Sequence, residues 1–280
     1  MPDLRQFHSR LALWLERAAL AGGCQWTATV TVDQAGAGRR VTLQGWPAPS
    51  DATSAALAYQ LGVQHLSETA GFEETSLQPA AAFGWSDGVE RHFVVSGPEG
   101  RASIVERCLV AGSLSMVGTA PHDAVDVLEG ITLQRLALPP QEFFGLALSI
   151  PVPGGGSVHE RMQFSKPTLG QQVTADHFVT PPGYTPASWL DRQVEALRSS
   201  TRKAEVVSRG AGRVIEGLIG EIATLKVAGH PASAGTIGVV ELDGELFEVA
   251  TWVPERGAAA MGWLAQHPRI QPVPDRTAPR

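Results

Sequence analysis

Histidine is the residue of this sequence best suited to acid–base catalysis or metal binding. Either role needs a partner at a suitable spacing, such as a second histidine four positions along a helix, a cysteine or a paired carboxylate. The eight histidines are scattered without such partners: His8, His65, His92, His122, His159, His177, His230 and His267. Asp176 and His177 are adjacent, but they lie in a strand-like run whose successive side chains point to opposite faces. This pair therefore cannot act as a general base and its orienting carboxylate.

Two glycine-rich segments resemble phosphate-binding loops only in composition. Gly36-Ala37-Gly38 and Gly210-Ala211-Gly212 do not join a strand to a helix, and no Lys-Ser/Thr follows either of them. Ser113 and Ser115 lack the glycine context of a nucleophile elbow. We therefore expect turns at both segments, and a chain that is not an enzyme and holds no cofactor or metal. The alternative is an enzyme whose catalytic residues come together only in the folded chain.

Composition excludes several other classes of protein. The 280 residues carry a net charge of −6 with 18% charged residues, so a basic nucleic-acid-binding face is not expected. No apolar run is long enough to span a membrane, and the run Leu11–Leu15 is too short for a signal peptide. Cys24 and Cys108 have no CxxC partner and fit buried, apolar positions. A cytoplasmic location is the expectation.

The second half of the chain repeats the order of elements of the first, about 133 residues later. Each half has two strand-like runs, a helix-like stretch and several further strands, which end at Pro121 and Pro254. Short turns between successive strands indicate an antiparallel sheet, and the helices are segregated from it, so the expected class is α+β. Asp243-Gly244 predicts a two-residue hairpin of type I′, because both central positions of that turn need positive φ.

This repeat predicts the domain layout. An N-terminal helix is expected within 1–23, capped by Asp3 and ended by Gly22-Gly23, because apolar residues recur every three or four positions. The first domain is expected at 24–135, a linker at 136–141, the second domain at 142–267 and a disordered tail at 268–280. This N-terminal helix has no counterpart in the second half. It either braces the core or contacts a partner.

The strand-like run Leu246–Val253 offers the one specific candidate for a binding surface. Phe247, Val249, Thr251 and Val253 can face a helix layer, and Leu246, Glu248, Ala250 and Trp252 then point the other way. A tryptophan on an open sheet face suggests an interaction site, since apolar patches on soluble proteins often mark one. Leu246 and Trp252 are therefore the predicted partner-binding residues. The alternative is that a loop or the other domain covers Trp252.

The order of elements resembles the DcrB/PsbP-like superfamily, in tandem. The similarity is carried by Ala187–Leu197, Arg213–Ala223 and Gly235–Val253 with a final proline, and in the first half by Phe83–Val95, Glu106–Met116 and Ala120–Asp123. It covers most of both halves as a pattern of elements, without invariant residues. This resemblance implies two PsbP-like domains, each an antiparallel sheet with helices packed around it, and a binding module rather than an enzyme.

Two branches of that superfamily imply different partners. Eag-type chaperones of type VI secretion dimerise around the apolar N-terminal segments of an effector, and a covalent tandem could replace that dimer in a monomer. Immunity proteins against type VI lipase effectors are two-domain chains with a stretch similar to Arg213–Glu221. Because the sequence shows no lipoprotein signal, we expect the first role, a cytoplasmic chaperone or adaptor for a secreted effector. The immunity role is the alternative, and a module for another partner is a third possibility.

Overall fold

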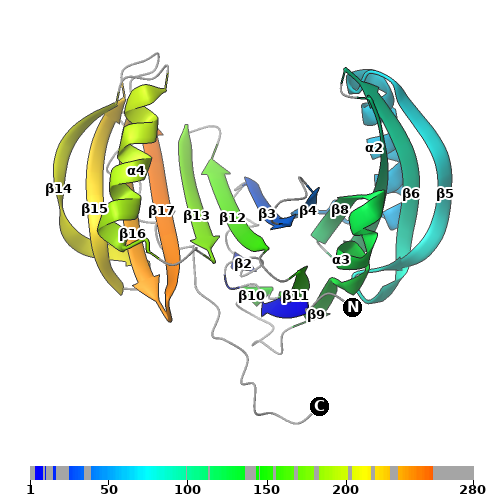
Figure 1. Cartoon of the computed structure of the whole chain (residues 1–280), viewed down its shortest axis with the longest axis horizontal. Helices are drawn as coiled ribbons and strands as arrows, with labels where there is room; N and C mark the ends of the chain where they lie inside the picture. The colour runs from blue at the N-terminus through cyan, green and yellow to red at the C-terminus, as the bar shows by residue number, and fades with distance from the viewer. Residues whose placement is uncertain are drawn as a thin grey trace, which may run out of the picture. The chain divides into compact units, whose positions relative to one another are not determined.

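The computed structural model places two compact units in this chain (Figure 1). It describes residues 4–8, 10, 15–16, 25–34, 39–98, 100–112, 114–135, 143–144, 146–153, 156–166, 170–179, 183–200, 204–215, 218–227 and 233–254. Unit 1 comprises Met1–Ser9, Thr27–Leu136 and Leu146–Val158. Unit 2 comprises Arg10–Trp26, Ala137–Gly145 and His159–Arg280. In both units strands predominate and a few helices lie against them, so the α+β class is confirmed.

Unit 1 contains a six-stranded antiparallel run in the order β3-β4-β8-β7-β6-β5. These strands are β3 (Gln25–Gln34), β4 (Arg39–Pro47), β5 (Phe72–Ala82), β6 (Trp85–Gly97), β7 (Gly100–Ala111) and β8 (Leu114–Pro121). Helix α2 (Ser54–Glu68) packs on β5, β6 and β7. A short helical segment, η1 (His122–Ala124) with α3 (Val125–Gly130), follows β8. A second sheet has the order β1-β11-β9, from β1 (Leu4–His8), β11 (Leu146–Pro153) and β9 (Thr132–Arg135).

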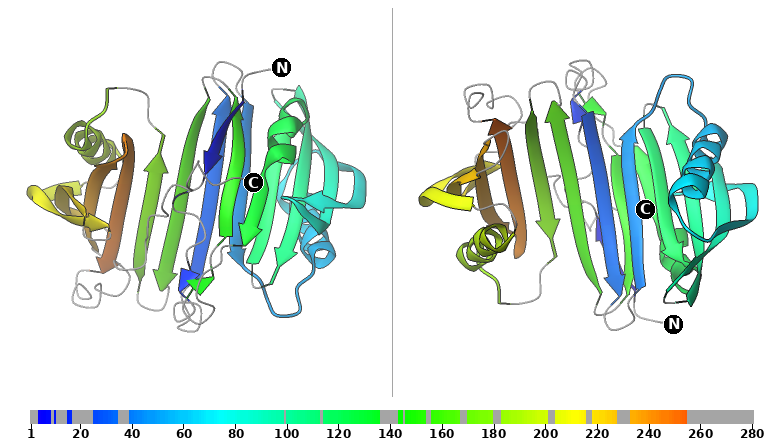
Figure 2. Two further views of the ribbon diagram at one scale, coloured as in Figure 1. Left: turned by 90° about the horizontal axis from the view of Figure 1, so that it is seen from below. Right: turned by 90° about the horizontal axis from the view of Figure 1, so that it is seen from above.

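Unit 2 contains the corresponding run in the order β12-β13-β17-β16-β15-β14. These strands are β12 (Ser157–Lys166), β13 (Gln171–Phe178), β14 (Ala204–Ile215), β15 (Leu218–Val227), β16 (Ser233–Leu242) and β17 (Glu245–Pro254). Helix α4 (Pro186–Ser199) packs on β14, β15 and β16. Figure 2 shows each long helix lying across one face of the sheet of its own unit. The short strands β2 (Leu15–Glu16) and β10 (Phe143–Phe144) pair separately.

The two units follow the same register as well as the same strand order. Helix α2 is capped by Thr53 and helix α4 by Thr185, 132 positions later. With that offset, the buried residues Leu57, Ala58 and Gly62 of α2 correspond to Trp189, Leu190 and Val194 of α4. The paired residues of the strands also correspond between the units. The offset is 132 positions for strands up to β6 and 131 for β7 and β8, which correspond to β16 and β17, and both values are close to the 133 inferred from sequence. Whether these units are PsbP-like domains stays a prediction.

The expected N-terminal helix is wrong where the chain is described. Leu4–His8 form β1, which pairs antiparallel with β11, from Leu4 opposite Pro153 to His8 opposite Ser149. An apolar spacing over so few residues is a weak preference, and pairing with the backbone of a neighbouring strand overrides it. Arg10 and β2 are also non-helical, and the rest of 1–23 up to Cys24 lies outside the described residues.

The units also divide the chain differently from the expected single boundary. Residues 146–158, expected at the start of the second domain, belong to unit 1, because β11 pairs with both β1 and β9. The predicted linker 136–141 and tail 268–280 lie outside the described residues. The Asp243-Gly244 hairpin is confirmed, with φ of 56° and 79° and Leu242 registered opposite Glu245.

Candidate functional site

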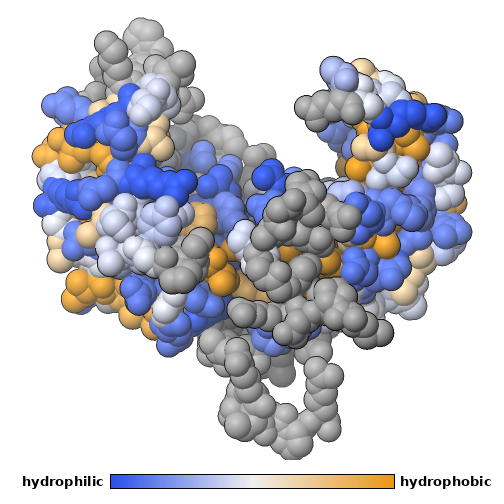
Figure 3. Space-filling model, viewed as in Figure 1, coloured by the Kyte–Doolittle hydropathy of each residue, from blue (hydrophilic) through white to orange (hydrophobic). Residues whose placement is uncertain are grey.

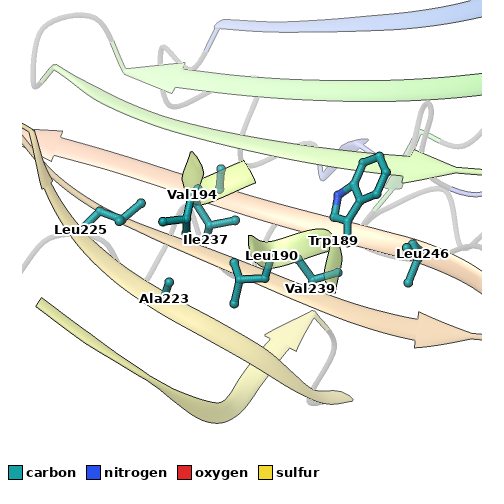
Figure 4. Close-up of a cluster of buried hydrophobic side chains, with 9 residues drawn as sticks. Trp189, Leu190, Val194, Ala223, Leu225, Ile237, Val239 and Leu246 are labelled. Carbon is teal, nitrogen blue, oxygen red and sulfur yellow. The ribbon is translucent and has the colours of Figure 1, made fainter. Parts of the chain in front are cut away.

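The predicted binding residues Leu246 and Trp252 belong to the core of unit 2. Leu246 is buried in a cluster with Trp189, Leu190 and Val194 of α4 (Figure 4). Trp252 is partly buried and packs against the same cluster. A side chain on Gly235 of the neighbouring strand would collide with the Trp252 ring, so that ring lies flat on the sheet. The prediction that Leu246 and Trp252 lie on an open, partner-binding face is therefore wrong, because helix α4 covers that face.

The error concerns the side of the sheet, not the alternation of the strand. Leu246 and Trp252 do share a face, and Phe247 belongs to the other one, where it stacks on His177. Both sets of β17 side chains are apolar enough to lie under a helix, so alternation alone could not decide which face α4 covers. Helix α4 brings Trp189, Leu190 and Val194 onto the Leu246 face, and the alternative of a covered Trp252 is the one observed.

Beside this apolar cluster, the same face of unit 2 carries a group of charged residues. We call His159, Arg161, Asp176 and Glu248 the charged cluster. The Asp176 carboxylate is buried and accepts hydrogen bonds from His159 Nε2 at 2.6 Å and from Arg161 Nε at 2.7 Å. Both donors reach solvent, with 35% of the His159 side chain and 51% of the Arg161 side chain exposed. A buried carboxylate thus holds two basic groups in place at the surface.

Glu248 adds a second buried carboxylate to this cluster. Its neighbour across the strand pair is Asp176, and its Oε2 accepts a hydrogen bond from Trp189 Nε1 at 2.9 Å. Burial, and then the negative charge of Asp176, raise the pKa of Glu248 to about 7. Glu248 therefore exchanges its proton near neutral pH, so the net charge of the cluster depends on pH in that range.

The opposite face of the same strands carries a buried ionic network. His177 is fully buried, and its ring nitrogens lie 2.8 Å from Glu160 Oε2 and 3.0 Å from Glu245 Oε2. Burial alone would lower the pKa of His177, but the hydrogen bonds to Glu160 and Glu245 raise it. Two carboxylate partners require both nitrogens to donate, so this imidazole is held as a cation and has no free nitrogen to act as a base.

Arg10 completes that network from the N-terminal segment. Its backbone N–H donates to Glu160, and its guanidinium donates to Asp243 and Glu245, each at 3.1 Å. The guanidinium also lies 5.2 Å from the Phe247 ring centroid, within cation–π range. The expectation that Asp176 and His177 point to opposite faces is confirmed, because Asp176 bonds to His159 and Arg161 of the charged cluster and His177 bonds to this network.

Unit 1 has its own buried ionic network, beneath α2. Arg91 donates to Glu106 Oε1 at 2.7 Å, to Glu74 at 2.8 Å and to the carbonyl oxygen of Ala58. His65 on α2 lies 3.0 Å from the other Glu106 oxygen. None of these contacts follows from local sequence, since Arg91 and Glu106 become neighbours only through the pairing of β6 with β7.

Other candidate groups do not form a reactive site in the described residues. Cys108 is a free, fully buried thiol, and burial together with the nearby Glu106 charge raises its pKa, which suppresses the reactive thiolate. The described part of the chain has no group of three potential metal ligands. It also has no helix long and apolar enough to cross a membrane. Cys24, Ser113 and Gly36-Ala37-Gly38 lie outside the described residues, and Gly210-Ala211-Gly212 lies within β14, not in the expected turn.

Comparisons with known proteins gave distant structural likenesses. No family model matches the sequence, and no curated protein matches it. The apo structure of the immunity protein TplEi of the type VI secretion system from Pseudomonas aeruginosa is similar with a TM-score of 0.45 and 12% identity, covering 90% of this chain and 93% of that one. The same protein complexed with "L" peptide gives 0.43 and 11%, over 90% and 93%. The Tle4–Tli4 complex gives 0.40 and 11%, over 82% and 81%. At these values the likeness assigns neither a family nor a function.

Proposed function

We propose that this chain is a non-enzymatic immunity protein that binds and neutralises an effector of type VI secretion. The observation that carries the proposal is the character of the face on which binding was expected. A chaperone for apolar segments needs an apolar groove there, but α4 closes it over Leu246 and Trp252. From the charged cluster on the same face, the side chains of His159 and Arg161 reach solvent.

A charged surface is better suited to an inhibitor of an enzyme than to a holder of apolar segments. Complementary charges speed association and select the partner, whereas apolar segments are held by burial of side chains. Figure 3 shows hydrophilic residues along the outer face of α4 in unit 2. Arg161 presents a cationic group over the buried Asp176 carboxylate, and the His159 imidazole lies beside it, so the proposed partner surface is acidic where it meets Arg161.

The non-enzymatic part of this proposal is supported by the state of the candidate catalytic groups. The His177 imidazole has carboxylates at both nitrogens, and the Cys108 thiol is buried with a raised pKa. Neither can supply a base or a nucleophile in that state. TplEi is an immunity protein of the type VI secretion system, and this chain is proposed to have the same role on the strength of its own surface.

The proposal is tested by co-expression with the product of the neighbouring gene as the candidate toxin. The chain should rescue cells from the toxin and should bind its catalytic domain in a pull-down. Arg161→Glu should weaken that binding and lower the association rate, and higher salt should reduce the difference from the unmodified chain. Arg40→Glu is the matched control, since Arg40 is also exposed and paired with an aspartate, Asp33, but lies in unit 1.

Two results would contradict the proposal. Binding only to the apolar N-terminal segment of the toxin, without rescue, would return the function to an effector chaperone. If Arg161→Glu changes neither the rescue of cells nor the binding of the toxin, the charged cluster is not part of the interface.

A further inference from the structure

The outer face of α2 carries large apolar side chains in solvent. Tyr59, Val63 and Leu66 recur at positions i, i+4 and i+7, which places them in one stripe along the helix. They are 70%, 51% and 68% exposed. We call these three residues the α2 stripe. The inner face of the same helix is separately packed on the sheet through Leu57 and Ala58, so the stripe contributes nothing to that contact.

The corresponding positions of α4 show that the fold does not require apolar residues there. At the offset of 132, Tyr59, Val63 and Leu66 correspond to Asp191, Glu195 and Arg198. All three are exposed, as in α2. The same position on the same fold is thus charged in unit 2 and apolar in unit 1. A helix that is apolar on both faces is typical of one that becomes buried on both.

The charges around the stripe point to the kind of partner. Residues 41–90 contain six acidic residues and neither lysine nor arginine, and three of the six, Glu73, Glu74 and Glu90, pair with arginines of β6 and β7. Asp51 lies just before α2 and Glu68 ends it, and in the described part of the chain neither takes part in an ion pair. The carboxylates therefore bracket the α2 stripe. The helix between them is 15 residues long, which is about 22 Å at the rise of an α-helix.

We infer that the α2 stripe is a docking site for an amphipathic helix with an apolar face and basic residues at both ends. Such a helix, four turns long, lays its apolar side chains on Tyr59, Val63 and Leu66 and places its cations near Asp51 and Glu68. The inference rests on the proposed function in one respect, that the effector supplies this helix. It adds a second contact, in unit 1, to the charged cluster of unit 2.

A synthetic helix tests the docking site without knowledge of the effector. The probe is an 18-residue peptide with leucines along one face and lysines at both ends, and its fluorescence anisotropy is followed on addition of the full chain. A second peptide has glutamate in place of each lysine. The decisive variant carries Tyr59→Asp, Val63→Glu and Leu66→Arg, the residues of α4. The control variant carries Gln60→Ala, which changes an exposed position beside the stripe.

The expected result is binding of the lysine peptide by the unmodified chain and by the control, with at least about tenfold weaker binding by the triple variant. Its melting temperature should be unchanged, because the three side chains are exposed. Failure of the lysine peptide to bind, equal binding by the triple variant, or equal binding of the glutamate peptide would overturn the inference. A second copy of the chain could also occupy the stripe. If the unmodified chain sediments as a dimer and the triple variant as a monomer, the inference is overturned as well.

The two proposals fail separately. Arg161→Glu should leave peptide binding unchanged, because the charged cluster lies in unit 2. Loss of rescue with intact peptide binding would count against the immunity role alone. Intact rescue with no peptide binding would count against the α2 docking site alone.

Discussion

The interiors beneath the two long helices differ more than the architecture around them. In unit 1, Arg91 on β6 pairs with Glu106 on β7, and both side chains are 1% exposed. The registers of unit 2 place Ala223 and Ile237 at the corresponding positions, also opposite each other, within an apolar cluster. The same strand order therefore accepts either an ion pair or an apolar pair at one place. Caps, turns and strand pairing determine the fold, and the chemistry of the interior can vary within it.

The side chains on the inner face of each long helix match in size the pair of residues beneath them. In unit 1 the inner face of α2 has Ala58 and Gly62, and a side chain on Gly62 would come within 2.8 Å of Arg91 Nη2. In unit 2 the corresponding residues Leu190 and Val194 fill the space that a guanidinium occupies in unit 1. Small residues above the ion pair and large residues above the apolar pair give both interiors a close-packed contact.

Breaking the ion pair of unit 1 should give the largest loss of stability. Arg91→Ala leaves Glu106 as a buried carboxylate without its main partner, and removal of one member of a buried pair commonly costs about 3–5 kcal/mol. Urea unfolding should show that loss in the free energy of unfolding. The matched control is Arg101→Ala, which breaks the exposed pair with Glu73 and should cost less than about 1 kcal/mol.

A transplant of the unit 2 interior sharpens the same test. The variant with Ala58→Leu, Gly62→Val, His65→Leu, Arg91→Ala and Glu106→Ile carries the unit 2 residues at all five positions. Replacing a buried ion pair with well-packed apolar residues is often neutral or stabilising, so this variant should recover most of what Arg91→Ala loses. A transplant no more stable than Arg91→Ala would mean that the two interiors are not interchangeable.

The apolar interior of unit 2 should respond to truncation by cavity formation. Leu246→Ala removes a buried side chain beneath α4 and should cost about 2–5 kcal/mol of unfolding free energy. Trp252 is only partly buried, so Trp252→Ala should cost less. Leu77→Ala, at an exposed position of β5, is the control and should change stability by less than about 0.5 kcal/mol. Weakened partner binding at an unchanged melting temperature would instead restore Leu246 to a binding surface.

These cases show what sequence can and cannot predict here. The Asp243-Gly244 turn was predictable because its conformation depends on two adjacent residues. The repeated order of elements was also predictable, to within one or two positions of the offset. The buried pair of Arg91 and Glu106 was not, because it depends on the pairing of strands and on Gly62 above them. Nor was the side of β17 under α4, since both faces of that strand carry large apolar side chains.

The free energy of unfolding should depend on pH through titratable groups of unit 2, above all Glu248 of the charged cluster. The folded-state pKa of Glu248 is about 7 against an ordinary 4.5, so the folded protein binds the extra proton between these values and loses stability as the pH rises through them. The full effect is at most about 3 kcal/mol. His177, whose pKa is also raised, acts in the same direction.

Glu248→Gln isolates the contribution of Glu248. The amide oxygen can still accept the Trp189 Nε1 hydrogen bond, but the side chain no longer ionises. Urea unfolding at pH 4, below the ordinary pKa of 4.5, should give nearly the same stability for variant and unmodified chain, and at pH 8 the variant should be the more stable. If the unfolding free energy of the variant still falls with pH as steeply as that of the unmodified chain, the pH dependence comes from His177 instead.

Removing the side-chain cap of a helix should give the smallest loss of stability, and the loss should be the same in the two units. Thr53 accepts from the Ala56 backbone N–H at 3.1 Å, and Thr185 accepts from the Ser188 N–H at 3.2 Å. Each Thr→Ala change removes one such bond and should cost about 1 kcal/mol, while Thr→Ser should keep it. In α4 alone, Ser188 Oγ also accepts from the Thr185 backbone N–H at 2.9 Å. That second bond survives Thr185→Ala, so thermal melts should show equal losses in the two units. A clearly larger loss at Thr185 would mean that the reciprocal cap of α4 acts as one cooperative unit, which α2 lacks.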